Sequence, residues 1–255
     1  MTGLEIFTIS ALAFGIGILI GCVGIGGVLL VPILAYIFNV PIHESVAAAM
    51  LAYIFSGIVG TIIYARHGSI RWKMAILIIA GAGPSAFIGA ALLSKTPSIW
   101  VEVFIASLIL VAGTNALIKN KEQSKDFEPK IKPAGLIGMG AITGLGSSIT
   151  GTGGPLLLVP MAVWLRYPTL TAIGLSQAVQ FPIAALATMG NVLYGNINWL
   201  LGSVLASALI LGAAIGARLA HAVPRDGLRS FLSWVLVMTG LLIFGQLGYF
   251  HVLSD

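Results

Sequence analysis

The stretch that decides the fold is GIGGVLLVP, from Gly24 to Pro32, inside an apolar segment that runs from residue 6 to residue 38. Glycine in a helix interior costs roughly 1 kcal/mol relative to alanine, so the cluster Gly24, Gly26 and Gly27 predicts a broken helix. As one straight helix the segment would be roughly 48 Å long, against a hydrocarbon core of about 30 Å. It is therefore either one tilted span with an overhang or a hairpin that enters and leaves the membrane on one side.

The composition around this stretch is typical of a polytopic membrane protein. Of the 255 residues, 58% are hydrophobic and 8% are charged, whereas soluble domains have roughly 25% charged residues. Further apolar runs that could enter a bilayer lie near residues 45–65, 74–93, 99–118, 135–165, 170–193, 200–220 and 228–248. The net charge of +5 therefore points to no nucleic-acid partner. The single cysteine, Cys22, excludes an intrachain disulfide and Cys-based metal clusters, and we expect no cofactor.

The glycine break recurs 127 residues later as GTGGPLLLVP, with Gly151, Gly153 and Gly154 at the positions of Gly24, Gly26 and Gly27. The same offset pairs Pro41 with Pro168, Gly68 with Gly195, Ile70 with Ile197, Trp72 with Trp199, Gly89 with Gly216, Pro97 with Pro224 and Gly113 with Gly240. Such an internal duplication is typical of transporters. It predicts one integral membrane domain made of a first repeat (1–118), a polar cytoplasmic linker (119–132) and a second repeat (133–255).

The positive charges favour the hairpin interpretation for both long segments. If each segment crosses once, eight of the thirteen Lys and Arg residues lie on one side and five on the other. If each is a hairpin, twelve lie on one side and only Lys95 on the other, as the positive-inside rule prefers. The loop 66–73 is basic and its counterpart 193–198 is not, as expected for inverted copies. We expect an all-α protein of two inverted repeats, with two hairpins, six spans and both termini outside.

The hairpin tips predict an anion-binding site near the membrane midplane. Each tip precedes the first turn of a return arm, where free N–H groups carry a partial positive charge, and glycine lets a substrate approach this backbone closely. The second tip adds four hydroxyl donors. The candidate residues in the tips are Gly24, Gly26, Gly27, Ser147, Ser148, Thr150, Gly151, Thr152, Gly153 and Gly154. The alternative is that small residues here only permit close helix packing.

GIGGVLLVPIL and GTGGPLLLVPM, each opening one half, resemble the TauE/SafE family of sulfite-exporter-like permeases. The YARHGSIRW and LYGNINW corners add to the resemblance, which covers nearly the whole chain. It implies a transporter of sulfite, sulfonates such as sulfoacetate, or another small anion. The family usually has small hydroxyl residues on the helix after each hairpin, and here only the second half retains them, in GLSQAVQ.

This departure predicts an asymmetric site in which polar residues of the second half provide most of the substrate recognition. Ser176, Gln177 and Gln180 join the candidate substrate-binding residues, and Met50 and Tyr53 lie opposite the two glutamines at the 127-residue offset. Gln177 and Gln180 share one helical face. The alternative is that these two glutamines form interhelical hydrogen bonds and do not bind substrate.

None of the eight acidic residues lies at the centre of an expected span, which argues against coupling through a buried carboxylate. We expect potential-assisted export of a small sulfur-containing anion by a multi-pass protein of the inner cell membrane. The sequence does not decide between a carrier and a passive channel. It is also compatible with a homodimer. An intramembrane enzyme acting on a lipid phosphate is disfavoured, because neither hairpin holds Asp, Glu, His, Lys or Arg near its tip.

Overall fold

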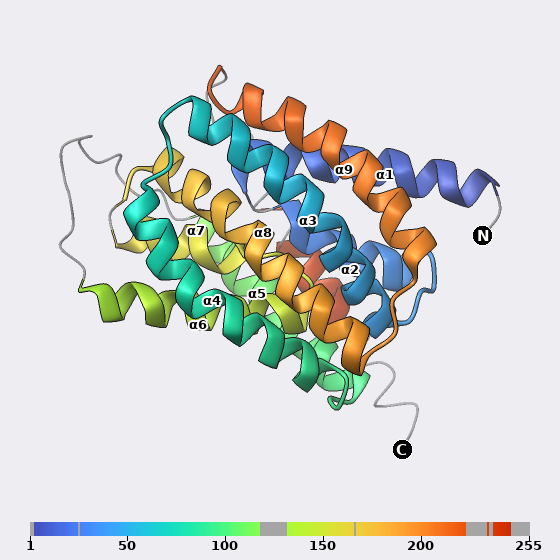
Figure 1. Ribbon diagram of the computed structural model, residues 1–255. Helices are drawn as coiled ribbons and strands as arrows, with labels where there is room; N and C mark the ends of the chain where they lie inside the picture. The colour runs from blue at the N-terminus through green and yellow to red at the C-terminus, as the bar shows by residue number, and fades with distance from the viewer. Residues whose placement is uncertain are drawn as a thin grey trace.

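The computed structural model describes residues 3–24, 26–117, 132–165, 167–222, 234 and 237–245, and every regular element in them is helical (Figure 1). The longer helices are α1 (Gly3–Val23), α3 (Ile42–Arg66), α4 (Trp72–Leu93), α5 (Ser98–Leu117), α6 (Pro133–Thr150), α8 (Thr169–Tyr194) and α9 (Trp199–Leu219). Within this part of the chain the expected all-α fold is confirmed. The linker at 119–132, except Lys132, and about half of the expected span at 228–248 lie outside the described residues.

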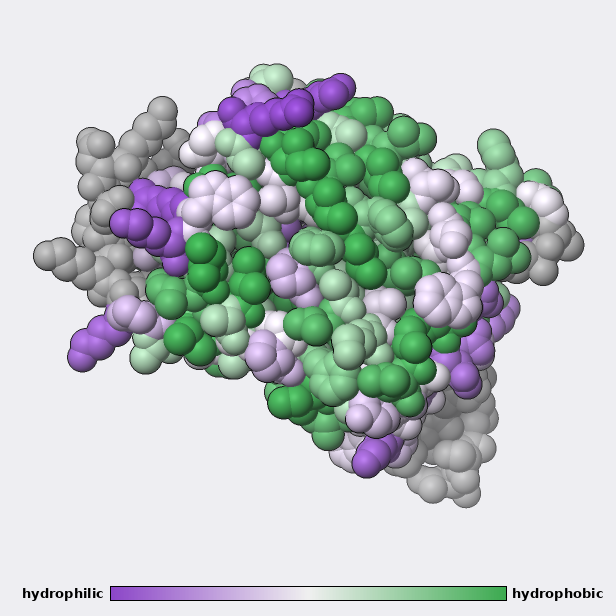
Figure 2. Space-filling model, in the orientation of Figure 1, coloured by the Kyte–Doolittle hydropathy of each residue, from purple (hydrophilic) through white to green (hydrophobic). Residues whose placement is uncertain are grey.

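Five of the described helices, α1, α3, α4, α8 and α9, are long and apolar enough to cross a membrane. Hydrophobic residues cover the middle of the face seen in Figure 2, and hydrophilic residues gather at its edges. Large apolar side chains such as Phe7, Ile76 and Leu211 are exposed, as lipid-facing residues are. The protein is therefore a multi-pass membrane protein.

The chain turns back on itself at both glycine breaks. Gly24 and Gly151 leave α1 and α6 with φ values of +80° and +69°, a left-handed conformation that glycine adopts without steric cost. Gly26 then packs against Leu19 of α1, and Gly146 of α6 packs against Leu157 of the return arm. The two long segments are therefore hairpins.

The two return arms differ. The second is one regular helix, α7 (Pro155–Trp164), whereas the first consists of a 3₁₀ turn, η1 (Gly26–Leu29), one α-helical turn, α2 (Leu30–Pro32), and a π turn, η2 (Ile33–Ile37). Pro155 stands at the first helical position, where its fixed φ favours helix initiation. The first arm has Val28 at the equivalent position, so we relate its irregular backbone to the absence of this proline.

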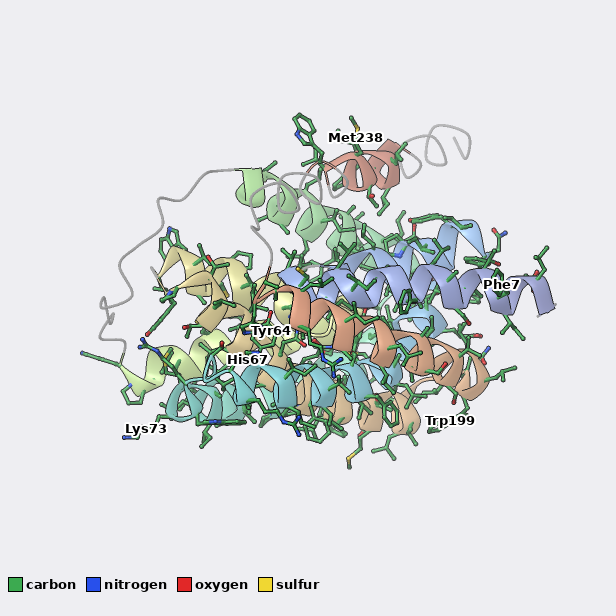
Figure 3. The ribbon with its side chains drawn as sticks, turned by 90° about the horizontal axis from the view of Figure 1, so that it is seen from above. Phe7, Tyr64, His67, Lys73, Trp199 and Met238 are labelled. Atoms are coloured by element: carbon green, nitrogen blue, oxygen red, sulfur yellow. The ribbon has the colours of Figure 1, made fainter. Side chains whose placement is uncertain are left out.

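The order of the contacts gives the direction of each helix. Gly57 packs against Phe181 and Gly60 against Gln177, so α3 and α8 run antiparallel. Lys73, near the start of α4, and Trp199, at the start of α9, lie at opposite ends of the molecule (Figure 3). The α3 and α8 helices therefore point in opposite directions, and α4 and α9 begin at opposite ends of the molecule.

Each hairpin packs on the third long helix of the other half, α1 against α9 and α6 against α4. Gly17 faces Leu209 and Gly21 faces Ala217, so α1 and α9 run parallel. Likewise α6 and α4 run parallel, since Gly81 faces Ile137 and Gly89 faces Leu145. Figure 1 shows α1 and α9 side by side. Exchanging the two halves leaves this pattern of contacts unchanged.

These helix pairs depend on glycine. Replacing Gly21 with alanine would place a Cβ atom 2.6 Å from the backbone nitrogen of Ala217. We expect Gly21→Ala to destabilise the protein by about 1–3 kcal/mol through overpacking, measured as a lower apparent melting temperature in detergent. Gly15→Ala on the same helix is the control, because its Cβ meets nothing within 4 Å. Equal melting temperatures for the two variants would contradict this account of the α1–α9 contact.

Candidate functional site

The two tips meet at Tyr53, near the middle of α3. Its hydroxyl donates a hydrogen bond to the carbonyl oxygen of Gly27 at 2.7 Å. A Cβ atom at Gly153 would lie 2.8 Å from the Tyr53 ring, and one at Gly27 would lie 3.3 Å from the carbonyl oxygen of Thr152. We call these four residues, Gly27, Tyr53, Thr152 and Gly153, the contact zone. Tyr53 is fully buried within it.

The tips overlap along their length. Gly24 lies against Val159 of α7 and against Ile173 and Ser176 of α8. Gly151 lies against Val31 of the first return arm and Val46 of α3. Each tip therefore extends beyond the contact zone and contacts the return arm of the other half. The contact zone lies close to the middle of α3 and α8.

The four hydroxyl groups of the second tip point in different directions. The Thr150 hydroxyl donates to the carbonyl of Gly146 at 2.7 Å and lies 3.1 Å from the Thr152 hydroxyl. The Ser147 hydroxyl is buried and has no hydrogen-bond partner within the described residues. Ser148 differs, because its hydroxyl lies against Gly89 of α4 and donates to Leu145. The structure thus brings Thr150 and Thr152 together and places Ser148 in the α4–α6 contact.

The polar residues of α8 divide between the two tips. Ser176 lies beside Gly24, and Gln177 donates through Nε2 to the carbonyl of Ile20 at 3.2 Å. Gln180 donates to the Ser56 hydroxyl at 3.0 Å, and its Cα lies 4.0 Å from the Cβ position of Gly154. All three α8 residues are buried. Gln177 therefore fastens the first tip, while Gln180 lies beside the second.

The two glutamines differ in what they can still offer. The Oε1 atoms of both have no partner in the described part of the chain. Gln177 cannot exchange its amide nitrogen and oxygen, because only nitrogen can donate to the Ile20 carbonyl. Gln180 can, when the Ser56 hydroxyl gives up its long 3.5 Å bond to the Tyr53 carbonyl and donates to the glutamine oxygen instead. Gln180 is thus able to turn an amide donor toward a ligand.

The backbone of the second tip also carries free donors. Leu157 and Leu158 donate to the carbonyl of Gly154, and Gly151 and Thr152 donate to that of Ser147. The amides of Gly153, Gly154 and Leu156 donate to no group among the described residues. Gly153 and Gly154 have φ values of +74° and +112°. This series of amides lies at the start of α7, where the helix dipole favours negative charge.

No ionisable residue supplies charge to this region. The buried side chains of the described residues that carry a polar atom are Ser, Thr, Gln, Asn, Tyr and Cys22, without an Asp, Glu, Lys, Arg or His, and the described residues contain no group of three or more His, Cys, Asp or Glu that could hold a metal. The arrangement can therefore donate hydrogen bonds to a ligand but cannot neutralise a cation. It also offers no nucleophile with a general base.

Charged residues lie instead at the ends of helices. His67, after α3, and His221, after α9, stack with ring centroids 4.0 Å apart, and Tyr64 lies beside His221 (Figure 3 labels Tyr64 and His67). The neighbouring Arg66 and Arg218 are exposed. Arg66, His67, Arg218 and His221 thus lie together at one end of the α3–α9 pair.

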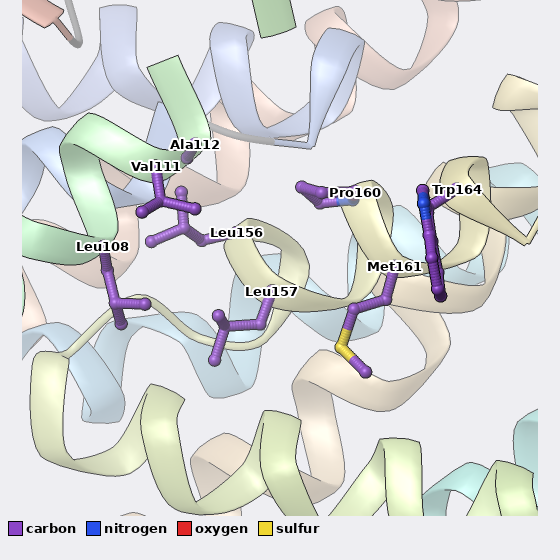
Figure 4. Close-up of a pocket in the computed structure, with 8 residues that line it drawn as sticks. All are labelled: Leu108, Val111, Ala112, Leu156, Leu157, Pro160, Met161 and Trp164. Atoms are coloured by element: carbon purple, nitrogen blue, oxygen red, sulfur yellow. The ribbon is translucent and has the colours of Figure 1, made fainter. Parts of the chain in front are cut away.

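A cavity of about 310 Å³ lies between α5 and α7 (Figure 4). Its lining residues are Leu108, Val111, Ala112, Leu156, Leu157, Pro160, Met161 and Trp164. These side chains give an anion almost no hydrogen-bond donors, so burial there would be costly. The cavity suits an apolar group and is separate from the contact zone.

The structure adds residues that the sequence interpretation did not include in the site. Tyr53 lies between the tips, and Ser56 links it to Gln180. Tyr64 donates to the carbonyl of Gly21 at 2.9 Å and so fastens the first tip. Tyr53 is equivalent to Gln180 at the 127-residue offset, and this equivalence could have identified Tyr53 as a site residue from the sequence.

The chain matches the family model described as "Sulfite exporter TauE/SafE" over residues 9–243. It is 24% identical to the probable membrane transporter protein YdhB of Bacillus subtilis, an alignment covering 90% of this chain and 96% of that protein. It is 26% identical to the probable membrane transporter protein MJ0441 of Methanocaldococcus jannaschii, with 89% and 91% covered. No solved structure matches the chain.

Proposed function

The chain belongs to the TauE/SafE family, and on that premise we propose that it exports a small sulfur-containing anion across the inner cell membrane. The substrate is sulfite or an organosulfonate such as sulfoacetate, and it passes the contact zone. The observation that carries this proposal is the set of buried hydroxyl and amide groups there, without a carboxylate among the buried side chains of the described residues. A buried anion needs donors, and a carboxylate beside it would repel it.

We infer that the two halves are inverted repeats. The antiparallel α3 and α8 support this, as do the opposite positions of Lys73 and Trp199. With two hairpins, twelve of the thirteen Lys and Arg residues fall on one side, which is then cytoplasmic. Inverted hairpins that meet near the middle of a bundle form the substrate site in several transporter folds.

We assign recognition mainly to the second half. Ser147, Thr152 and Gln180 supply side-chain donors, Thr150 positions the Thr152 hydroxyl, and Gly153 and Gly154 supply amides. Gly24, Gly26, Gly27 and Gly151 shape the remaining wall by allowing close approach. Ser176 and Gln177 hold the first tip in position, and Ser148 holds α6 against α4.

The burial of the contact zone favours one transport mode. Tyr53 is fully buried between the tips, which favours a carrier with alternating access over an open channel. With the cytoplasm negative, one negative charge moving outward gains about 2.3 kcal/mol per 100 mV. Flux in sealed vesicles should follow an imposed membrane potential and show counterflow of labelled against unlabelled substrate. Flux that follows only a proton gradient contradicts the potential-driven mode.

Removing the Thr150 hydroxyl tests the site. We expect Thr150→Val to weaken binding of the best ligand among sulfite, thiosulfate, sulfoacetate, taurine and sulfate by about tenfold, or about 1.4 kcal/mol, because the Thr152 hydroxyl loses the side-chain partner that positions it. The measurement is calorimetry or thermal shift on the purified protein. Thr114→Val on α5 is the matched control, since both hydroxyls donate at 2.7 Å to the carbonyl four residues earlier. Equal ligand affinity in the two variants would place the site elsewhere.

A further inference from the structure

One face of α8 carries a line of polar residues that extends beyond the proposed site. Gln177, Gln180, Thr188 and Asn191, with Ala184 between them, follow one another at steps of three or four residues. At 3.6 residues per turn they lie within about 80° of helix circumference and extend over about 21 Å. All are buried, whereas Met189 and Leu193 on other sides of the helix are exposed. The face therefore points into the bundle.

Each polar residue on this face has an atom without a hydrogen-bond partner in the described part of the chain. These atoms are Oε1 of Gln177, Oε1 of Gln180, Oγ1 of Thr188 and Nδ2 of Asn191. Ser147 Oγ is the fifth such side-chain atom. Buried polar groups are nearly always paired, and an unpaired one costs free energy. Four unpaired groups on one face of one helix therefore indicate that something else pairs with them.

The first half shows that the repeat itself does not require this pattern. Thr61 and Tyr64 occupy the positions equivalent to Thr188 and Asn191. The Thr61 hydroxyl lies within hydrogen-bond distance of the carbonyls of Gly57 and Gln177, and Tyr64 donates to Gly21. Both first-half side chains are paired, so the unpaired groups belong to the second half alone.

We propose that Thr188 and Asn191 form a second subsite for a small oxyanion, on the substrate path between the contact zone and the α8–α9 loop. This inference rests on the proposed function. The Asn191 amide and the Thr188 hydroxyl are donors, and Gln180 can turn its amide toward the same side. Asn191 lies about 16 Å along the helix from Gln180. An anion leaving the contact zone thus meets donors until it nears the end of α8.

Apolar replacement at this subsite should change stability and transport in opposite directions. Thr188→Val and Asn191→Leu remove an unpaired buried group, so we expect an unchanged or higher apparent melting temperature. Transport of the substrate should fall about tenfold, because donors along the path are lost. Thr61→Val is the matched control, and it should lower the melting temperature because its hydroxyl is paired. Transport within twofold of the parent in both subsite variants would overturn the proposal.

Cysteine labelling tests the path without any substrate. In a Cys22→Ala background, we expect Asn191→Cys to react with a membrane-impermeant maleimide, added from the side of the α8–α9 loop, at least tenfold faster than Met189→Cys, which is exposed on an outer side of α8. Equal, slow labelling of the two would overturn the path. If Asn191→Cys reacts fast and no oxyanion binds, the proposed function fails and the path stands. If oxyanions bind and Asn191→Cys stays unreactive, only the path fails.

Discussion

Valine in place of Gly153 is expected to cost about 2–5 kcal/mol and to reduce transport at least about tenfold. A left-handed conformation costs an L-residue roughly 1–2 kcal/mol, and overpacking adds about 1–3 kcal/mol. Gly153 has φ of +74°, and its Cβ would lie 2.8 Å from the Tyr53 ring. The new side chain would therefore push the two tips apart at the contact zone. Uptake in proteoliposomes and the apparent melting temperature measure the two effects.

The control for this variant is Gly138→Ala, on the same hairpin. A Cβ at Gly138 meets nothing within 4 Å, and alanine favours a helix interior by about 1 kcal/mol over glycine. We expect this control to transport normally and to melt at the same or a higher temperature. If Gly153→Val also transports normally, the second tip does not take part in transport.

Much of the fold could be predicted from the sequence because its landmarks recur at an offset of 127 residues. The 127-residue offset relates the starts of α3 and α8, Ile42 and Thr169, and those of α4 and α9, Trp72 and Trp199. The expected breaks occur at Gly24 and Gly151, both with positive φ. A local signal suffices at these positions, because only glycine adopts this conformation without cost.

The detail of the tips could not be predicted, because it depends on contacts between distant helices. Sequence spacing indicates that Ser148 is near a tip, but not that its hydroxyl faces Gly89. Spacing likewise does not reveal that the Gln177 amide is committed to Ile20. Tertiary packing decides these features.

Tyr53→Ala is expected to destabilise the protein by about 3–5 kcal/mol, the usual cost of removing a buried aromatic ring. The ring of Tyr53 lies against Gly153, and its hydroxyl holds Gly27. Without this side chain a cavity would separate the tips, and a buried carbonyl would lose its donor. The drop in apparent melting temperature in detergent, roughly 2–4 °C per kcal/mol for a chain of this size, measures the loss.

Tyr53→Phe then separates the hydroxyl from the ring. It keeps the packing and leaves the Gly27 carbonyl unpaired, at a cost of about 1–3 kcal/mol, whereas Tyr194→Phe removes a hydroxyl from a side chain that is 52% exposed and should cost almost nothing. The first tip receives three side-chain bonds, from Tyr53, Tyr64 and Gln177. The described residues of α3 and α8 give no such bond to the second tip. If Tyr53→Phe proves as stable as Tyr194→Phe, the first tip is not held by its hydrogen bonds, and the asymmetry between the two hairpins must arise from packing alone.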